Sequence, residues 1–165
     1  MEIRPIRDGD DRFAISHVYE ESWKSAYRGI IPQAYLDAIP VGRWTKTVDD
    51  PARNSLVLLD GSKIVGTSSY GASRFVDRQG YGEIVSIYLL PEYFELGYGT
   101  QLQQAAMGGL LQMGYPDIFL WVLEDNARAR RFYERLGFQD GHTYLDDNIG
   151  GKALREMQYL RHIGQ

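Results

Sequence analysis

The chain has 165 residues, of which 44% are hydrophobic and 24% are charged, and its formal net charge is −4; this composition is typical of one folded domain. The mild negative charge and the lack of a Lys/Arg-rich run argue against nucleic-acid binding. The absence of cysteine excludes disulfides, thiolate metal sites and a cysteine nucleophile. No apolar stretch has the length of a signal peptide or a membrane span, so we expect a cytoplasmic protein with no membrane partner.

The first half of the chain shows both strand and helix periods. Alternation predicts strands, and apolar residues at helical spacing predict helices. Asp60-Gly61 joins two β-like runs, which is typical of a hairpin. The expected elements are a strand over 1–6, a helix from Asp11 to Gly29, a short helix over 32–39 with Pro32 first, and a hairpin within 55–72.

The second half reads as a strand–helix–strand–helix unit followed by two closing strands. We expect a strand over 81–90, a helix from Gly99 to Gly114, a buried strand over 117–124, a helix over 126–136 capped by Asn126, and an antiparallel pair, 138–145 and 154–163, joined by a loop at 146–151. No linker or repeat interrupts this order, so residues 1–165 form one α/β domain with a mixed sheet.

The segment "PEYFELGYGTQL", residues 91–102, places two glycines between a predicted strand and a predicted helix. Backbone N–H groups at a helix N-terminus carry partial positive charge, and glycine lets a phosphate approach the backbone. The alternative is a tight turn that needs glycine for its shape alone. The segment lacks the Gly-Lys-Ser/Thr of a Walker loop and the third glycine of a dinucleotide fingerprint.

A second segment, "LWVLEDNARARRFYERLGF", runs from a strand through Asn126 into a helix that ends near Gly137. Together the two segments give an ordered set of motifs that resembles the GNAT N-acetyltransferase superfamily, and the resemblance is best over residues 55–140. The motifs, in chain order, are Glu83-Ile84, Pro91, Gly97-x-Gly99, Asn126-xx-Ala129-xx-Phe132-Tyr133 and Leu136-Gly137-Phe138.

The resemblance implies a mixed, mostly antiparallel sheet of about seven strands, splayed between two parallel central strands and flanked by about four helices. It implies acetyl-coenzyme A as co-substrate, with the pantetheine arm in the gap between the two strands and Tyr133 near its sulfur as proton donor. It assigns further contacts with the cofactor to Ile87, Tyr88, Leu89, Glu95, Leu96, Gly97, Tyr98, Gly99, Thr100 and Asn126.

The sequence departs from the family pattern beside the first glycine. The family usually carries Gln or Arg three residues before that glycine and often a basic residue just before it, where this chain has Phe94 and Leu96. Backbone amides can still bind the pyrophosphate, because a helix N-terminus needs no side chain for this. Candidates for the missing basic contacts are Arg128, Arg130 and Arg131, although such arginines can equally be solvated.

Two residues carry the expected proton transfers. Glu83 lies in an apolar β run, where a carboxylate is paired, at an edge, or catalytic. In some branches of the family a glutamate at this spacing is the general base, and Glu124 is the rival here. Tyr133 is the expected acid, and a core aromatic is the alternative role for its side chain.

The resemblance places one wall of the acceptor site at Trp23, Tyr27 and Tyr35, and its mouth at a loop with Asp146 and Asp147. Aromatic rings and carboxylates suit a cation, while core packing and a solvated turn are the alternatives. The three histidines show no ligand spacing, so no metal is expected. We therefore predict transfer of acetyl to a primary amine of a small molecule or a peptide N-terminus. The alternative is a non-catalytic acyl-coenzyme-A sensor, and the oligomeric state stays open, with a homodimer as one option.

Overall fold

The computed structural model describes residues 1–164. The strands are Glu2–Pro5 (β1), Asn54–Asp60 (β2), Lys63–Ala72 (β3), Gly82–Leu89 (β4), Asp117–Leu123 (β5), Gln139–Ile149 (β6) and Lys152–His162 (β7). The α-helices are Arg12–Ala26 (α1), Gln33–Asp37 (α2), Tyr98–Gln112 (α3) and Ala127–Arg135 (α4), and short 3₁₀ turns occupy Thr47–Asp49, Val76–Arg78 and Pro91–Tyr93.

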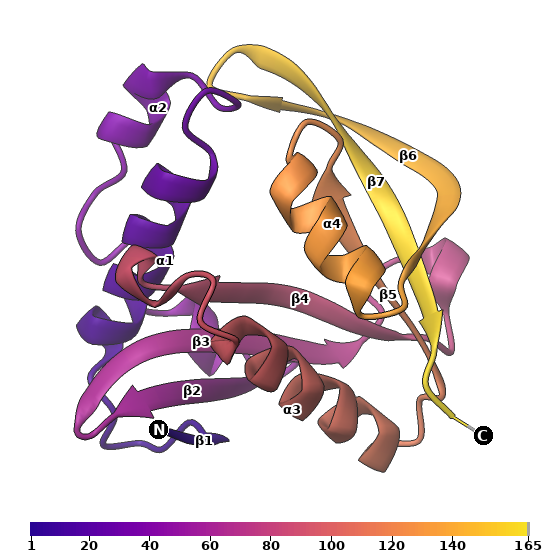
Figure 1. Cartoon of the computed structure of the whole chain (residues 1–165), viewed down its shortest axis with the longest axis horizontal. Helices are drawn as coiled ribbons and strands as arrows, with labels where there is room; N and C mark the ends of the chain where they lie inside the picture. Colours follow the sequence, from indigo (N-terminus) through magenta and orange to yellow (C-terminus); the bar gives the residue numbers. More distant parts are fainter. Residues whose placement is uncertain (165) are drawn as a thin grey trace.

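The seven strands form one sheet in the order β1-β2-β3-β4-β5-β7-β6, in which only the β4–β5 pair is parallel (Figure 1). The fold class expected from the sequence, a mixed and mostly antiparallel sheet with four helices, is therefore confirmed. Local signals placed the elements well. The Asp11 carboxylate caps α1 by accepting from the Phe13 and Ala14 amides, and Asp60 ends β2 at the predicted hairpin.

One boundary prediction was wrong. Asp146 and Asp147 lie inside β6, not in a loop, and the turn between β6 and β7 contains only Gly150 and Gly151. Their local sequence favours a turn, but pairing with Arg155 and Leu154 of β7 extends the ladder through them. Because β6 is an edge strand, polar side chains are well tolerated there.

The helices cover both faces of the sheet. On one face α1 contacts β4, where the Tyr19 and Tyr88 rings lie 4.7 Å apart. On the other face α3 crosses β3 and β4, and Arg130 of α4 donates to the Tyr159 hydroxyl of β7. A smaller apolar cluster joins α2 to the ends of β5 and β7; its buried members are Ile31, Leu36, Ile39, Leu123 and Leu154.

The parallel pair at the centre of the sheet is short. β4 and β5 pair only at Gly82–Ile118 and Glu83–Phe119. Just beyond this point the register with β3 jumps from Ile84 to Ser86, so Val85 is an extra, bulged residue of β4. A bulge bends its strand, and the two central strands separate beyond it. This separation is the feature that positions the site.

Two adjacent glycines of α3 offer a test of the packing between this helix and the sheet. A Cβ at Gly109 would overlap the hydroxyl end of the Tyr70 ring, whereas a Cβ at Gly108 would meet nothing within 4 Å. We expect Gly108→Ala to stabilise the fold by about 0.5–1 kcal/mol through helix propensity. Gly109→Ala should destabilise it by about 1–3 kcal/mol through overpacking. Urea unfolding measures both, and equal shifts in one direction would contradict this packing.

Candidate active site

The inner edge of β4 carries backbone groups that face the gap. The Leu90 N–H donates to the Val65 carbonyl of β3 at 2.9 Å, and the Ser86 carbonyl accepts from Ser68 at 2.8 Å. Successive residues of a strand direct their backbone groups to opposite edges. Ile87 and Leu89 therefore face away from β3, and within residues 1–164 the pairing with β5 stops before them. These groups fit an extended chain laid along β4.

The loop after β4 leads into α3 with the geometry of an anion site. Glu95 and Gly97 both have left-handed backbone, with φ of 62° and 88°, and Gly97 is the N-cap of the 15-residue helix. The first N–H groups of a helix have no partner within it, which here leaves the Tyr98, Gly99 and Thr100 amides free of helical bonds. Curved runs of N–H groups of this kind bind phosphate. We call residues 95–100 the cradle.

Of the three candidate arginines, Arg128 reaches the cradle. Arg128 of α4 lies over the Phe94 ring at 4.3 Å from its centroid, and its Nε is 3.7 Å from the Glu95 carboxylate. Arg130 is used elsewhere, because it donates to the Tyr159 hydroxyl at 3.0 Å and to the Glu124 carbonyl at 3.2 Å. Leu96 itself is 62% exposed beside the anion site.

Three tyrosines from three elements meet at the gap. Burial, and then the neighbouring Tyr88, raises the pKa of Tyr133 well above its ordinary value. Burial, followed by Tyr133, does the same to the pKa of Tyr27, and burial, followed by Tyr27 and Tyr19, raises the pKa of Tyr88. All three hydroxyls are therefore protonated at neutral pH, and each can donate a proton. The structure thus brings Tyr133 of α4 and Tyr27 of α1 together, as the two roles assigned to them require.

Glu83 lies at the closed end of the gap, where β4 and β5 still pair. Its side chain is 1% exposed. Arg74 holds both carboxylate oxygens, through Nη2 at 2.6 Å and Nε at 3.1 Å, and its backbone N–H adds a third bond at 3.1 Å. Oε1 accepts two of these bonds and Oε2 accepts one, so Oε2 keeps a free position for a proton. The rival Glu124 is 43% exposed and lies 3.9 Å from Arg155.

Asn126 caps α4 by accepting from the Ala129 amide at 3.2 Å. This structural role is compatible with a contact to the cofactor, which stays a prediction. The α4 helix also packs against the cradle, since a Cβ at Gly99 would lie 3.4 Å from the ring of Phe132 in α4.

The expected acceptor wall comes from α1 and α2. The Trp23 and Tyr27 rings pack edge to face at 4.9 Å, and both contact the small apolar cluster under α2. Tyr35 lies against Gly150 in the β6–β7 turn. Asp146 and Asp147 lie on opposite faces of the sheet, because neighbouring residues of a strand alternate between faces and cross-strand partners share one. Asp147 pairs with Leu154 on the face toward α2, while Asp146 pairs with Arg155 on the other face.

The sequence interpretation missed two side chains of this region. Tyr88 was assigned through its backbone alone, yet its hydroxyl lies among those of Tyr27 and Tyr133. Glu156 of β7 was read only as part of a strand, and it is half-buried on the face toward α1. A signal was present for the second: Glu156 is a carboxylate on the same face of its strand as Leu154 and Leu160.

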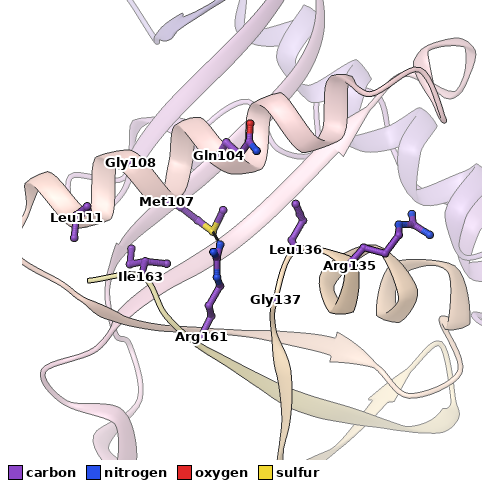
Figure 2. Close-up of a pocket in the computed structure, with 9 residues that line it drawn as sticks. All are labelled: Gln104, Met107, Gly108, Leu111, Arg135, Leu136, Gly137, Arg161 and Ile163. Atoms are coloured by element: carbon purple, nitrogen blue, oxygen red, sulfur yellow. Dashed lines mark hydrogen bonds between the residues drawn. The ribbon is translucent and has the colours of Figure 1, made fainter. Parts of the chain in front are cut away.

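A surface hollow lies elsewhere, between α3, α4 and the end of β7 (Figure 2). It has a volume of about 540 Å³, and Arg161 crosses it to donate to the Met107 sulfur at 3.1 Å. Its lining residue Leu136 lies one turn of α4 beyond Tyr133, but none of the three tyrosines is among the residues that line it. We assign it no part in the chemistry.

A bulged and splayed parallel pair, an anion cradle at the end of β4 and a half-buried tyrosine on α4 define an acyltransferase that uses a coenzyme A thioester. The profile of the Acetyltransferase (GNAT) family matches residues 15–138. The chain belongs to this family, whose members use acetyl-coenzyme A, so the resemblance inferred from the motifs is confirmed.

Relatives agree with this assignment. "Uncharacterized N-acetyltransferase YuaI" of Bacillus subtilis (strain 168) is 31% identical over 148 residues, covering 87% of this chain and 83% of that protein. An "Uncharacterized N-acetyltransferase" of Archaeoglobus fulgidus is 33% identical over 137 residues, covering 81% and 89%. The fold matches that of the PaiA N-acetyltransferase of Thermoplasma acidophilum, solved in complex with coenzyme A. The TM-score is 0.74 at 20% identity, over 98% of this chain and 99% of that one.

Within residues 1–164, no three His, Asp or Glu side chains lie close enough together to hold a metal ion. In the same part of the chain, no helix is both long and apolar enough to cross a membrane.

The cradle can be tested at Gly99. A Cβ at this position would lie 3.4 Å from the Phe132 ring, which the packing admits, but we expect the two further methyl groups of valine to obstruct the anion site. We expect Gly99→Val to place its branched methyls among the first amides of α3 and to weaken coenzyme A binding at least tenfold, or about 1.4 kcal/mol. Calorimetry measures the affinity. Gly99→Ala is the matched control and should lose less. A folded Gly99→Val variant with parental affinity would exclude the cradle.

Proposed function

We propose that this N-acetyltransferase moves acetyl from acetyl-coenzyme A to a primary amine by direct attack, with residues of the β4–β5 gap as its catalytic machinery. The observation that carries the proposal is the unpaired inner edge of β4, which runs from the buried end of the gap to the cradle. Ile87 and Leu89 lie on this edge, and the Tyr133 hydroxyl lies beside it.

The bound co-substrate would supply a thioester carbonyl and a thiol leaving group. Ile87 and Leu89 would hold its pantetheine arm through their N–H and C=O groups, and the cradle would hold its pyrophosphate through backbone amides. The Leu89 N–H would also donate to the thioester oxygen, where negative charge develops. Arg128 would supply the positive charge that a basic residue at the position of Leu96 supplies in the family, although Glu95 neutralises part of the charge of Arg128.

Tyr133 would donate a proton to the sulfur as it leaves. Its side chain is half-buried, and burial raises its pKa well above the ordinary value, so the hydroxyl keeps its proton at neutral pH and can donate a hydrogen bond to the sulfur. A free thiol has a pKa of about 8.5, so the thiolate benefits from a donor near neutral pH.

Glu83 would take the proton of the amine, directly or through one or two waters. A primary amine has a pKa near 10 and arrives protonated at neutral pH, so the reaction needs such a base. The ion pair with Arg74 leaves one position for this proton, on Oε2, which accepts a single hydrogen bond.

The competing hypothesis is a non-catalytic sensor of acyl-coenzyme A. The relatives described above carry the name N-acetyltransferase, which supports the enzyme instead. Release of free thiol from acetyl-coenzyme A with a panel of amines tests the proposal. The panel includes polyamines, aminoglycosides, amino acids and peptide N-termini. Turnover with at least one amine is expected, whereas tight coenzyme A binding without turnover on any of them would favour the sensor.

The two proton-transfer roles predict different pH profiles. Tyr133→Phe should lower kcat by about 10²–10⁴-fold at every pH, with little change in acetyl-coenzyme A affinity. Glu83→Gln should lower the rate at neutral and acidic pH and recover in part as the pH rises, because alkali supplies free amine. Steady-state rates from pH 6 to 10 check both. If both variants keep near-parental kcat throughout, these residues are structural.

A further inference from the structure

One carboxylate beside the gap, that of Glu156, has no hydrogen-bond or ion-pair partner among residues 1–164. Glu156 pairs with Leu123 of β5 and with Leu145 of β6, so these three side chains share one face of the sheet. Leu123 and Leu154 on that face pack under α2. Glu156 therefore faces α1 and α2, which form the expected acceptor wall, and it is half-buried there.

The surroundings of Glu156 are negative. Its neighbours with charged or ionisable side chains are Tyr27 from α1, Asp147 from β6 and Arg74 from the loop after β3. Arg74 is bound to Glu83 through two guanidinium hydrogen bonds. Within residues 1–164 Glu156 accepts no hydrogen bond, and its pKa is raised by burial and then by Asp147, with Arg74 opposing the rise.

A second polar group on the same face is also unused. Gln158, two residues along β7, is fully buried, and its Oε1 accepts from Arg78 at 2.7 Å. Its Nε2 has no partner among residues 1–164, and neither does the indole N–H of Trp121, its cross-strand neighbour on β5. Unmet buried donors cost free energy. A face with an unpaired carboxylate beside unmet donors suits a molecule with an ammonium group near an oxygen acceptor.

We propose that Glu156 binds the ammonium group of the acceptor, and that the acceptor is the amino end of a peptide or amino-acid amide. This inference rests on the proposed function, because it names the substrate class of the same site. The ammonium group would pair with Glu156, close to Tyr27 at the mouth of the gap. The carbonyl oxygen that follows an α-amino group would accept from the donors around Gln158, a partner that an alkyl polyamine lacks.

The direct test is calorimetric titration of L-alaninamide into the protein saturated with coenzyme A. The parent should bind L-alaninamide more tightly than 1,3-diaminopropane, which has no oxygen. Glu156→Gln should weaken L-alaninamide binding at least tenfold and leave coenzyme A affinity unchanged. Glu2→Gln makes the same change of charge on β1, at the opposite edge of the sheet, and should bind like the parent.

Thermal unfolding excludes damage to the fold as the cause. Because the folded-state pKa of Glu156 is raised, its ionisation destabilises the protein as the pH rises through that pKa. Glu156→Gln should therefore be at least as stable as the parent at neutral pH, and this advantage should vanish at acidic pH, where both side chains are neutral.

The outcomes separate this inference from the proposed function. Parental L-alaninamide affinity in Glu156→Gln, or tighter binding of 1,3-diaminopropane by the parent, would overturn the inference even if amines are acetylated. If no amine of the panel gives thiol release, but L-alaninamide still binds through Glu156, the proposed reaction is contradicted and the assignment of Glu156 is supported.

Discussion

The parting of β4 from β5 is the constraint on which the site depends. The two strands pair for only two residues before the bulge at Val85, so the backbone groups of Ile87 and Leu89 that face β5 are left without a strand partner in the middle of a sheet. Unpaired backbone groups inside a protein cost free energy. A ligand that runs along this edge supplies the missing hydrogen bonds, so the cost to the free protein favours the complex.

The same parting explains the arrangement of the side chains. Tyr88 of β4, Tyr27 at the C-terminal end of α1 and Tyr133 of α4 come from both faces of the sheet, and the opening between the strands lets each influence the pKa of another. Burial keeps them protonated. At the closed end Glu83 is neutralised by Arg74, while on the β7 side Glu156 is not neutralised. The gap is thus acidic where an amine would enter and rich in proton donors where a thiol would leave.

Local signals in the sequence predicted much of this fold. Asp11, Asn126 and Asp60-Gly61 act within a few residues of the chain, and the structure places each at the expected cap or turn. Gly97 takes the left-handed backbone that its place before a helix requires. The order of motifs then predicted the parallel central pair and the family.

Features that depend on distant contacts could not be read in the same way. The bulge at Val85 appears only in the register with β3. The Arg74–Glu83 pair depends on the path of the loop after β3, and the strand assignment of Asp146 and Asp147 depends on β7. Glu156 is an ordinary strand residue by sequence. Whether it has a partner depends on the packing of β7 against β5, β6 and the helices α1 and α2, which the sequence of β7 does not contain.

The central claim, that coenzyme A completes the inner edge of β4, is tested most directly by residue-resolved amide hydrogen exchange with and without coenzyme A. Exchange at Ile87 and Leu89 should slow markedly on binding, whereas exchange at Leu90, whose N–H already bonds to β3, should change little. Saturating coenzyme A with unchanged exchange at Ile87 and Leu89 would contradict the account.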